Sequence, residues 1–582
     1  MSGIVRPLVL ILAAGTLMSA GQPFSHQPGP LSTLHGDAMR HPGSHSMRAM
    51  IMASAAVVQQ NEIAAAPLYD GLGKVHVPVT TANPRAQRYF DQGLGFAYGF
   101  NHAAAIAAFR EAQRLDPNCA MCFWGEAFAY GPNINAPMEP ESNARAVGLA
   151  RYADWLAIKA TPKERALTGA MVKRYSPDLG ADRAKLDADY ADAMLAAAGA
   201  HPSSDPIALI AAEAAMDTRP WDYWSADKQP NPRIGEAVRL VETVLARNPE
   251  HPQGAHLYIH LMENGPDPKR AEAAADRLAT PLSPTAGHLV HMPAHIYYRV
   301  GRWKDSIRVN VDAARADEAY LKASGDKGLY RYGYYPHNVH FIVTSAQMSG
   351  DMPTAIREAR RLGTLLDPGT SAKIAWIQAI NAAPYFAAAQ FETPARILAM
   401  PKADARMPYI VGMRHYARAT AYALQRNRAG FDREIGQLAR LREHGDFKAM
   451  IDQGVPAPQL LQLAETVARG RFAMFGGRYD DAVRLYGDAA AQEAKIPYME
   501  PPFWYYPVQQ SLGAALYKAG KYAEAREAFT KALEQSPNNG WVLYGLAATN
   551  RATGLKAEAE AADAALKRAW AGDPRWLRME RL

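Results

Sequence analysis

The chain has 582 residues, with 48% hydrophobic and 21% charged side chains, which excludes a disordered polymer. Its two cysteines cannot cross-link so long a chain, so a fold held together by disulfides is also excluded. The net charge of +7 is small, and no basic run alternates with aromatic residues, so nothing indicates nucleic-acid binding. Because single cores stop growing at roughly 250–300 residues, we expect several domains or a repeat array.

The beginning of the chain has the pattern of an export signal. Arg6 precedes a short apolar run that small residues follow, which is the order found in secretory signal peptides. We predict a signal peptide at residues 1–21, a poorly ordered linker at residues 22–79, and a periplasmic or secreted location. A second, weaker signal-like segment leaves Met47 and Met50 open as translation starts. We expect no membrane span, because no later stretch is long and apolar enough.

A spacing of small and apolar residues recurs along the chain. Near the C-terminus it comprises Leu512, Gly513, Ala525, Phe529, Ala532 and Pro537, and near the N-terminus Tyr89, Gly93, Phe96, Ala105, Phe109, Ala112 and Pro117. Further copies place the small residue of their second helix, the anchor of the hairpin, at Ala482, Ala237, Ala271, Ser306 and Ala355. Small residues let antiparallel helices approach, an aromatic residue fills the wedge between them, and proline ends the pair. The spacing resembles that of the tetratricopeptide repeat.

The resemblance implies an all-α fold. We expect a solenoid of tetratricopeptide-like helical hairpins over residues 80–570, wound as a right-handed superhelix with a concave groove, and a C-terminal tail at residues 571–582. In that family the groove is lined by the first helix of each hairpin and usually binds a peptide or a partner protein. A protein or peptide is therefore the expected partner, with no nucleic acid, and the oligomeric state stays open.

Histidines concentrate in the middle repeats. Seven of the 17 lie close together, at His256, His260, His288, His291, His295, His337 and His340. All seven lie between residues 256 and 340, where the average histidine frequency of the chain predicts about two or three. Such clustering on a few hairpins indicates a site.

The register of these histidines repeats from one hairpin to the next. His256, His291 and His340 precede the anchors Ala271, Ser306 and Ala355 by one constant interval, which we call the first register position. His260 and His295 share the second register position, nearer the anchors, and His288 and His337 share the third, farther from them. These positions form one stripe along a helix, which Glu263 continues. In tetratricopeptide geometry the stripe would face the groove rather than the core.

The stripe predicts a metal site. Two imidazoles spaced four residues apart on a helix can bind one ion, so we predict metal ligands among the seven histidines and Glu263. Imidazoles without thiolates suit Zn, Cu, Ni or Fe. Other interpretations stay open: the histidines are solvated groove residues, or hydrogen-bonded spacers between helices, or a cluster that binds an anionic ligand or changes its own charge near pH 6. A metal-dependent enzyme using Glu263 and a metal-free scaffold also remain possible, so the sequence does not decide whether the chain is an enzyme.

Two further groups of residues are candidates. Export favours a disulfide between Cys119 and Cys122, while a thioredoxin-like role would need a βαβ unit that the pattern lacks. Aromatic runs flank the histidines, and we expect Tyr298, Tyr335 and Asn338 to form walls of the same pocket.

Overall fold

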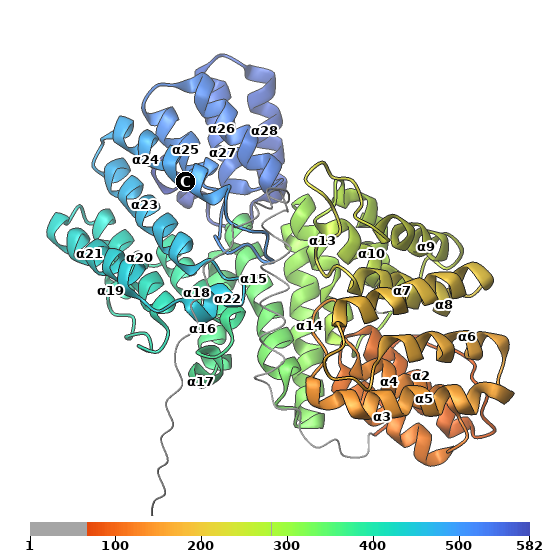
Figure 1. Ribbon diagram of the computed structural model, residues 1–582. Helices are drawn as coiled ribbons and strands as arrows, with labels where there is room; N and C mark the ends of the chain where they lie inside the picture. The colour runs from red at the N-terminus through yellow and green to blue at the C-terminus, as the bar shows by residue number, and fades with distance from the viewer. Residues whose placement is uncertain (1–66, 281) are drawn as a thin grey trace, which may run out of the picture. The chain divides into compact units, whose positions relative to one another are not determined.

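The computed structural model describes residues 67–280 and 282–582 (Figure 1). The predicted signal peptide, both alternative start sites and most of the predicted linker lie outside these residues. Within them no β-strand forms, and only two isolated bridges occur, Asn133 with Ala136 and Trp224 with Pro230. The all-α, tetratricopeptide-like fold class is confirmed.

Most helices follow one another with short connections, and longer segments separate α8 from α9 and α24 from α25. The first group comprises α2 (Pro84–Tyr98), α3 (His102–Leu115), α4 (Ala120–Tyr130), α5 (Asn143–Leu156), α6 (Pro162–Met171), α7 (Arg183–Ala200) and α8 (Asp205–Asp217). The middle group comprises α9 (Ile234–Arg247), α10 (Pro252–Glu263), α11 (Glu272–Leu278), α12 (Gly287–His291), α13 (Pro293–Val300), α14 (Trp303–Ser324), α15 (Tyr335–Ser349) and α16 (Met352–Leu365). These middle helices carry the histidine stripe.

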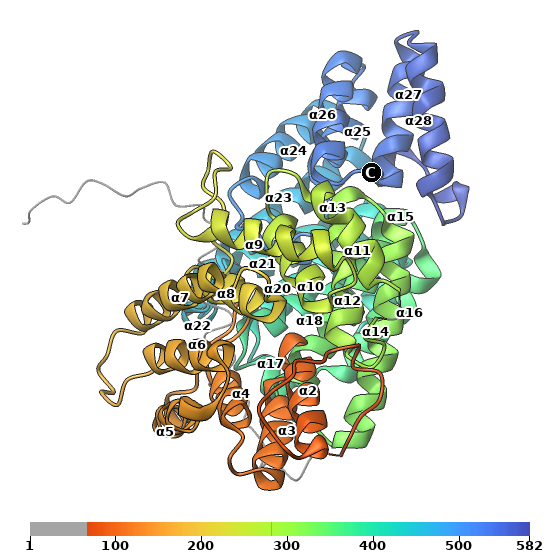
Figure 2. The same ribbon diagram turned by 90° about the vertical axis from the view of Figure 1, so that its right-hand side faces the viewer.

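The remaining helices continue the same pattern to the C-terminus. They are α17 (Pro368–Ser371), α18 (Ala375–Phe391), α19 (Pro394–Leu398), α20 (Pro408–Leu424), α21 (Arg428–His444), α22 (Lys448–Asp452), α23 (Ala457–Phe475), α24 (Tyr479–Glu493), α25 (Gln509–Lys518), α26 (Tyr522–Gln535), α27 (Gly540–Ala552) and α28 (Lys556–Ala569). Neighbours pack as hairpins, among them α2 with α3, α14 with α15, α23 with α24, and α25 with α26 (Figure 2).

Glycines and aromatic rings explain why these helices pair. A Cβ at Gly93 of α2 would lie 2.7 Å from the Phe109 ring of α3, and a Cβ at Gly125 of α4 would overlap the same ring. Phe529 of α26 is related in the same way to Gly513 and Gly545, on the helices before and after it. Each ring therefore fills the wedge between two first helices, which approach closely because glycine has no side chain.

The segments at both ends of the solenoid are held by contacts. Residues 67–79, the end of the expected linker, form no helix, but the Tyr69 and Val79 amides donate to the Gln92 and Gln87 side chains of α2, at 2.7 and 3.0 Å. In the expected C-terminal tail, two short 3-10 helices form over Pro574–Trp576 and Met579–Arg581. The Ser511 hydroxyl donates to the Leu582 carbonyl oxygen at 2.8 Å, so the structure extends to the last residue.

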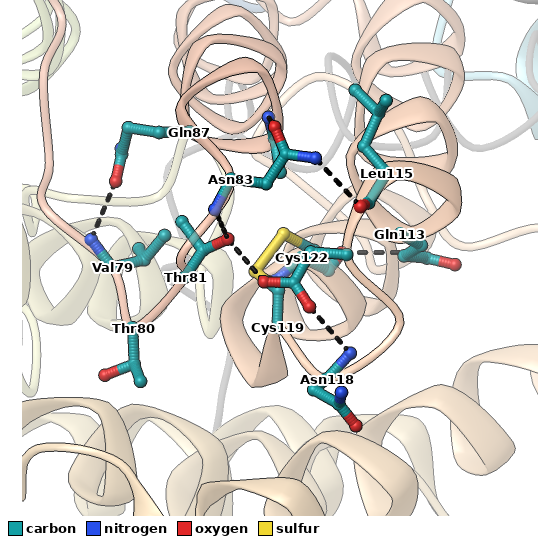
Figure 3. Close-up of a disulfide and its surroundings, with 12 residues drawn as sticks. Val79, Thr80, Thr81, Asn83, Gln87, Gln113, Leu115, Asn118, Cys119 and Cys122 are labelled. Carbon is teal, nitrogen blue, oxygen red and sulfur yellow. Dashed lines mark hydrogen bonds between the residues drawn. A yellow bond between two sulfur atoms is a disulfide. The ribbon is translucent and has the colours of Figure 1, made fainter.

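The start of α4 carries the disulfide. Cys119 and Cys122 are bonded to each other and fully buried (Figure 3). The neighbouring connection is fixed by Asn83, whose side-chain amide donates to the Leu115 carbonyl oxygen at 3.0 Å, and by Gln113, which donates to the Cys122 carbonyl oxygen at 3.2 Å. The bond therefore closes one turn at a buried helix start, as a structural disulfide would.

Among the described residues, none of the helices has the length and hydropathy needed to cross a bilayer.

Candidate metal centre

Three successive hairpins supply the histidines. His256 and His260 lie on α10, His288 and His291 on α12, His295 on α13, and His337 and His340 on α15. Proline breaks the hydrogen-bond ladder between α12 and α13, but Met292 at the junction keeps helical angles of φ −50° and ψ −38°. The stripe expected on one first helix is therefore preserved across the break.

Six of the seven histidines form two groups of three. The first triad is His256, His260 and His288, and the second triad is His291, His295 and His337; in each, one ring nitrogen per residue lies within 4.8 Å of the others. A third group of the same compactness is formed by Glu263, His295 and Glu500. His340 belongs to none of these groups. Each triad therefore draws its side chains from two neighbouring hairpins.

These histidines are buried. His256, His260, His288, His291 and His295 are at most 3% exposed, and only His337 is half-buried. The expectation of a stripe facing an open groove is therefore wrong. The stripe is covered by the turn after α2, by the connection before α9 and by the segment before α25.

One carboxylate holds a histidine of each triad. Glu263 accepts from Nδ1 of His260 through Oε1 and from Nδ1 of His295 through Oε2, both at 2.7 Å. Since an ionised carboxylate only accepts hydrogen bonds, the Nδ1 atoms of both rings carry a proton. The Nε2 atoms are left for other contacts, and His260 Nε2 is buried with no hydrogen-bond partner.

Two amide side chains hold a further histidine in each triad. His256 Nδ1 lies 3.1 Å from Gln253 Oε1, and the Gln253 amide nitrogen donates to Glu213 at 3.0 Å. His291 Nδ1 lies 2.6 Å from Asn310 Oδ1, and the Asn310 amide nitrogen donates to the Ser306 carbonyl oxygen at 2.7 Å. Because each amide nitrogen is used elsewhere, each amide oxygen accepts from Nδ1–H.

The freed Nε2 atoms face one another. His291 Nε2 lies 2.7 Å from His295 Nε2, and His256 Nε2 lies 3.2 Å from His288 Nε2. Two neutral rings protonated at Nδ1 would point lone pairs at each other at 2.7 Å, which is repulsive unless a proton or a metal ion lies between them. The same pattern, with Nδ1–H on an oxygen acceptor and Nε2 turned inward, is that of histidine ligands in metal sites.

Glu500 joins the site from far away in sequence. It lies in the proline-rich segment between α24 and α25, and its carboxylate contacts His295 Nδ1 beside Glu263. From the same segment, the Tyr498 hydroxyl donates to Glu263 Oε2 at 3.4 Å. Sequence reasoning missed Glu500 because it stands 205 residues from His295 in a segment without repeat register.

Burial and charge set the protonation of the rings. Burial lowers the pKa of His256, His260, His288, His291 and His337 well below the usual value, so these imidazoles are neutral and able to bind a metal. Burial also lowers the pKa of His295, but the Glu263 and Glu500 carboxylates outweigh it and raise that pKa to about 10. Burial, together with Glu263, raises the pKa of Glu500 to about 8.

Aromatic rings enclose both triads. Phe100 lies 4.6 Å from His256 and Trp221 lies 5.0 Å from His260, between ring centroids. Tyr334 lies 4.9 Å from His288, and Phe341 lies 4.9 Å from His291. Tyr334 belongs to the aromatic run before His337 that the sequence marks as a candidate pocket wall, whereas Phe100, Trp221 and Phe341 were not expected at the site.

The residues expected to line the pocket make their main contacts away from the two triads. Tyr335 hydrogen-bonds Glu318 at 2.7 Å and packs in a separate apolar cluster with Val339, so it is no wall of this site. Asn338 donates to Asp317 at 2.7 Å, and Tyr298 packs on Trp303, with a centroid separation of 4.8 Å. Tyr298 also contacts Phe341, which borders the site, with 5.8 Å between ring centroids.

Comparison with known proteins identifies the repeat. Residues 516–581 match the family model described as tetratricopeptide repeat. This C-terminal segment is a tetratricopeptide-repeat segment. A curated relative, small glutamine-rich tetratricopeptide repeat-containing protein 2 of Mycosarcoma maydis, is 30% identical over 146 residues, which are 24% of this chain. The chain spans 39% of that relative's length.

Solved structures that are similar to the chain at low identity include the following two. A human IFIT1 dimer with PPP-AAAA is 13% identical, with a TM-score of 0.28, over 82% of this chain and 89% of that one. Yeast Tom70 is 12% identical, with a TM-score of 0.23, over 83% of this chain and 91% of that one.

Proposed function

We propose that this tetratricopeptide-repeat protein binds a transition metal, Zn, Cu, Ni or Fe, in the two histidine triads, and that its hairpins bind a partner protein. The repeat supports the second part only in general terms, because such repeats commonly mediate protein–protein contacts. The metal site is supported by residues particular to this chain.

The observation that carries the metal site is the facing of the Nε2 atoms of His291 and His295 at 2.7 Å. Their Nδ1 atoms are engaged by Asn310 and by Glu263 with Glu500, so the Nε2 atoms cannot turn away. His260 Nε2 is buried without a hydrogen-bond partner, which costs stability, and a metal ion in the first triad would satisfy it.

We also propose that the protein is exported from the cytoplasm. Residues 1–21 have the order of a signal peptide, and the buried Cys119–Cys122 disulfide suits an oxidising compartment. N-terminal sequencing of the protein from fractionated cells tests this. A mature chain outside the cytoplasm that begins after a cleaved leader is expected, and an uncleaved cytoplasmic chain would contradict it.

Element-resolved mass spectrometry of the full chain without a His-tag, purified without chelators, tests the metal site. We expect stoichiometric transition metal in the wild type and its loss in the His256→Ala, His291→Ala double variant. His415→Ala is the matched control, because His415 also has Nδ1 on a carboxylate, Glu434 at 2.7 Å, but lies on α20.

Circular dichroism accompanies these measurements, so that loss of metal is separated from loss of fold. If the double variant is helical and retains its metal, the assignment is wrong. If the wild type binds no Zn, Cu, Ni or Fe after dialysis against each ion, the proposed function is wrong.

A further inference from the structure

The two triads are copies of one site, related by the repeat. Each takes the histidines at the first and second register positions of one hairpin, and the histidine at the third register position of the next. For the first triad the anchors of these hairpins are Ala271 and Ser306, and for the second they are Ser306 and Ala355. Equivalent positions in a repeat have equivalent surroundings, so both triads are suited to the same ion.

The register also explains why the array has two sites. The third register position before Ala271 is occupied by Gln253, and the second register position before Ala355 by Thr344. Gln253 instead holds His256 in place, and Thr344 leaves His340 without the second histidine that a triad needs. This accounts for the absence of His340 from the groups formed by the described residues.

The two triads adjoin each other. Glu263 bonds His260 of the first and His295 of the second, each at 2.7 Å, so one carboxylate orients a ligand on both sides. The rings of His260 and His295 are 5.7 Å apart between centroids, and those of His288 and His291 are 6.0 Å apart. Ions held by the two triads would therefore be neighbours within one centre.

Ligand number and type narrow the choice of metal. Each triad offers three imidazoles and no thiolate. Cu(I) accepts three ligands, whereas Zn(II) takes four and adds a water in a three-histidine site. Aromatic rings enclose both triads, which favours the ion that needs no fourth ligand.

We infer that the two triads form one dinuclear copper centre that binds a pair of Cu(I) ions, oriented in common by Glu263. The inference rests on the proposed metal-binding function and assigns its metal and its nuclearity. Glu263 is a positioning residue in this centre, because its oxygens contact Nδ1 atoms on the side of each ring away from the ion.

Copper titration of the full-length, untagged apo-chain under anaerobic conditions is the first experiment. We expect two Cu(I) per chain, retained against a tenfold excess of Zn(II), with a Cu–Cu vector in the X-ray absorption spectrum at about 3.5–4.5 Å, near the spacing of other two-metal sites. Oxidation with ferricyanide removes one electron from each Cu(I). The resulting neighbouring Cu(II) pair should give an electron paramagnetic resonance signal well below that expected for two isolated ions.

Single-triad variants separate one ion from two. His337→Ala should keep one copper in the first triad and give the full signal of an isolated Cu(II), and His288→Ala should do the same for the second triad. Glu263→Gln, which keeps the side-chain shape, should lower the affinity of both copper ions by about 10–100-fold, as loss of an orienting carboxylate does elsewhere. His415→Ala should behave as the wild type.

The outcomes distinguish the two proposals. If the chain binds one Zn(II) per triad in preference to Cu(I), or if its two Cu(II) ions are magnetically isolated, the dinuclear copper centre is wrong and metal binding stands. If a folded chain binds none of Cu, Zn, Ni and Fe, both proposals are wrong.

Discussion

The C-terminal hairpins and the histidine-bearing hairpins use one framework in two ways. In the hairpin of α25 and α26, whose anchor is Ala525, the first and second register positions hold Gln510 and Ala514, both buried. In the hairpins that begin with α10 and with α12 and α13, the same positions hold histidines, equally buried. The hairpin therefore packs without imidazoles, and their presence in the middle of the chain calls for an explanation other than folding.

The difference lies in how the buried polar atoms are satisfied. In the C-terminal hairpin, packing of Phe529 against Gly513 and Gly545 is apolar and complete by itself. On α12 and α13, His291 and His295 each have an oxygen acceptor on one side of the ring and the other imidazole on the opposite side. The first arrangement needs nothing further, whereas the second needs a proton or a metal ion between the rings.

The largest expected effect comes from removing an aromatic ring from the apolar packing of the C-terminal hairpins. Phe529→Ala empties the wedge between α25 and α27 and should cost about 3–5 kcal/mol of stability. Hydrogen exchange should rise across α25–α28, while the metal content of the triads stays at the wild-type level. Metal loss in this variant would show that the two regions do not differ in the way described.

Removal of the metal should affect the histidine-bearing hairpins instead. If both triads bind their ions, chelation should lower the free energy of unfolding of α10, α13 and α15. The expected loss is about 2.7 kcal/mol, compared with protein at a metal concentration one hundred times the dissociation constant. Exchange in α25–α28 should not change. Uniform loosening of both regions, or none, would contradict the assignment of the metal to the triads.

The amide that orients His291 should matter less than the ligands themselves. Asn310→Ala removes the acceptor of His291 Nδ1–H and should reduce metal affinity by about 10–100-fold with the helix intact. Asn381→Ala is the matched control, since Asn381 also donates to the carbonyl oxygen four residues earlier, at 2.9 Å, but lies on α18. Equal losses in the two variants would mean that Asn310 acts only through stability.

The smallest effect concerns pH in the C-terminal region. Burial raises the pKa of Glu493 to about 8 from an ordinary value near 4.5. Between these values the folded chain holds a proton that the unfolded chain has released, so stability falls as pH rises through this window. Glu493→Gln should flatten the fall in urea-midpoint measurements between pH 5 and about 8. An unchanged slope would assign the pH dependence to other groups.

The helical fold and the histidine register could be predicted from sequence, because both follow from spacing. His256 and His260 recur as His291 and His295 at a constant interval from the small residues of the second helices. Glu500 could not be predicted in this way, since its segment follows no repeat.

The spacing of residues also could not predict that the histidines are buried or which neighbouring tyrosine faces them. The histidines are enclosed by Phe100 and Trp221, which come from other hairpins and connections. Tyr335 was expected at the site, yet its neighbour Tyr334 is there instead, because consecutive helical residues point about 100° apart. A one-residue error in register is enough to exchange a wall of the site for a residue of another cluster.

Anomalous diffraction at a metal absorption edge, from crystals of the metal-loaded chain, tests the central claim most directly. The account predicts peaks at about 2.0–2.1 Å from the Nε2 atoms of His256, His260 and His288, and of His291, His295 and His337. Well-ordered triads without a peak, or metal found only on surface histidines such as His444, would contradict it.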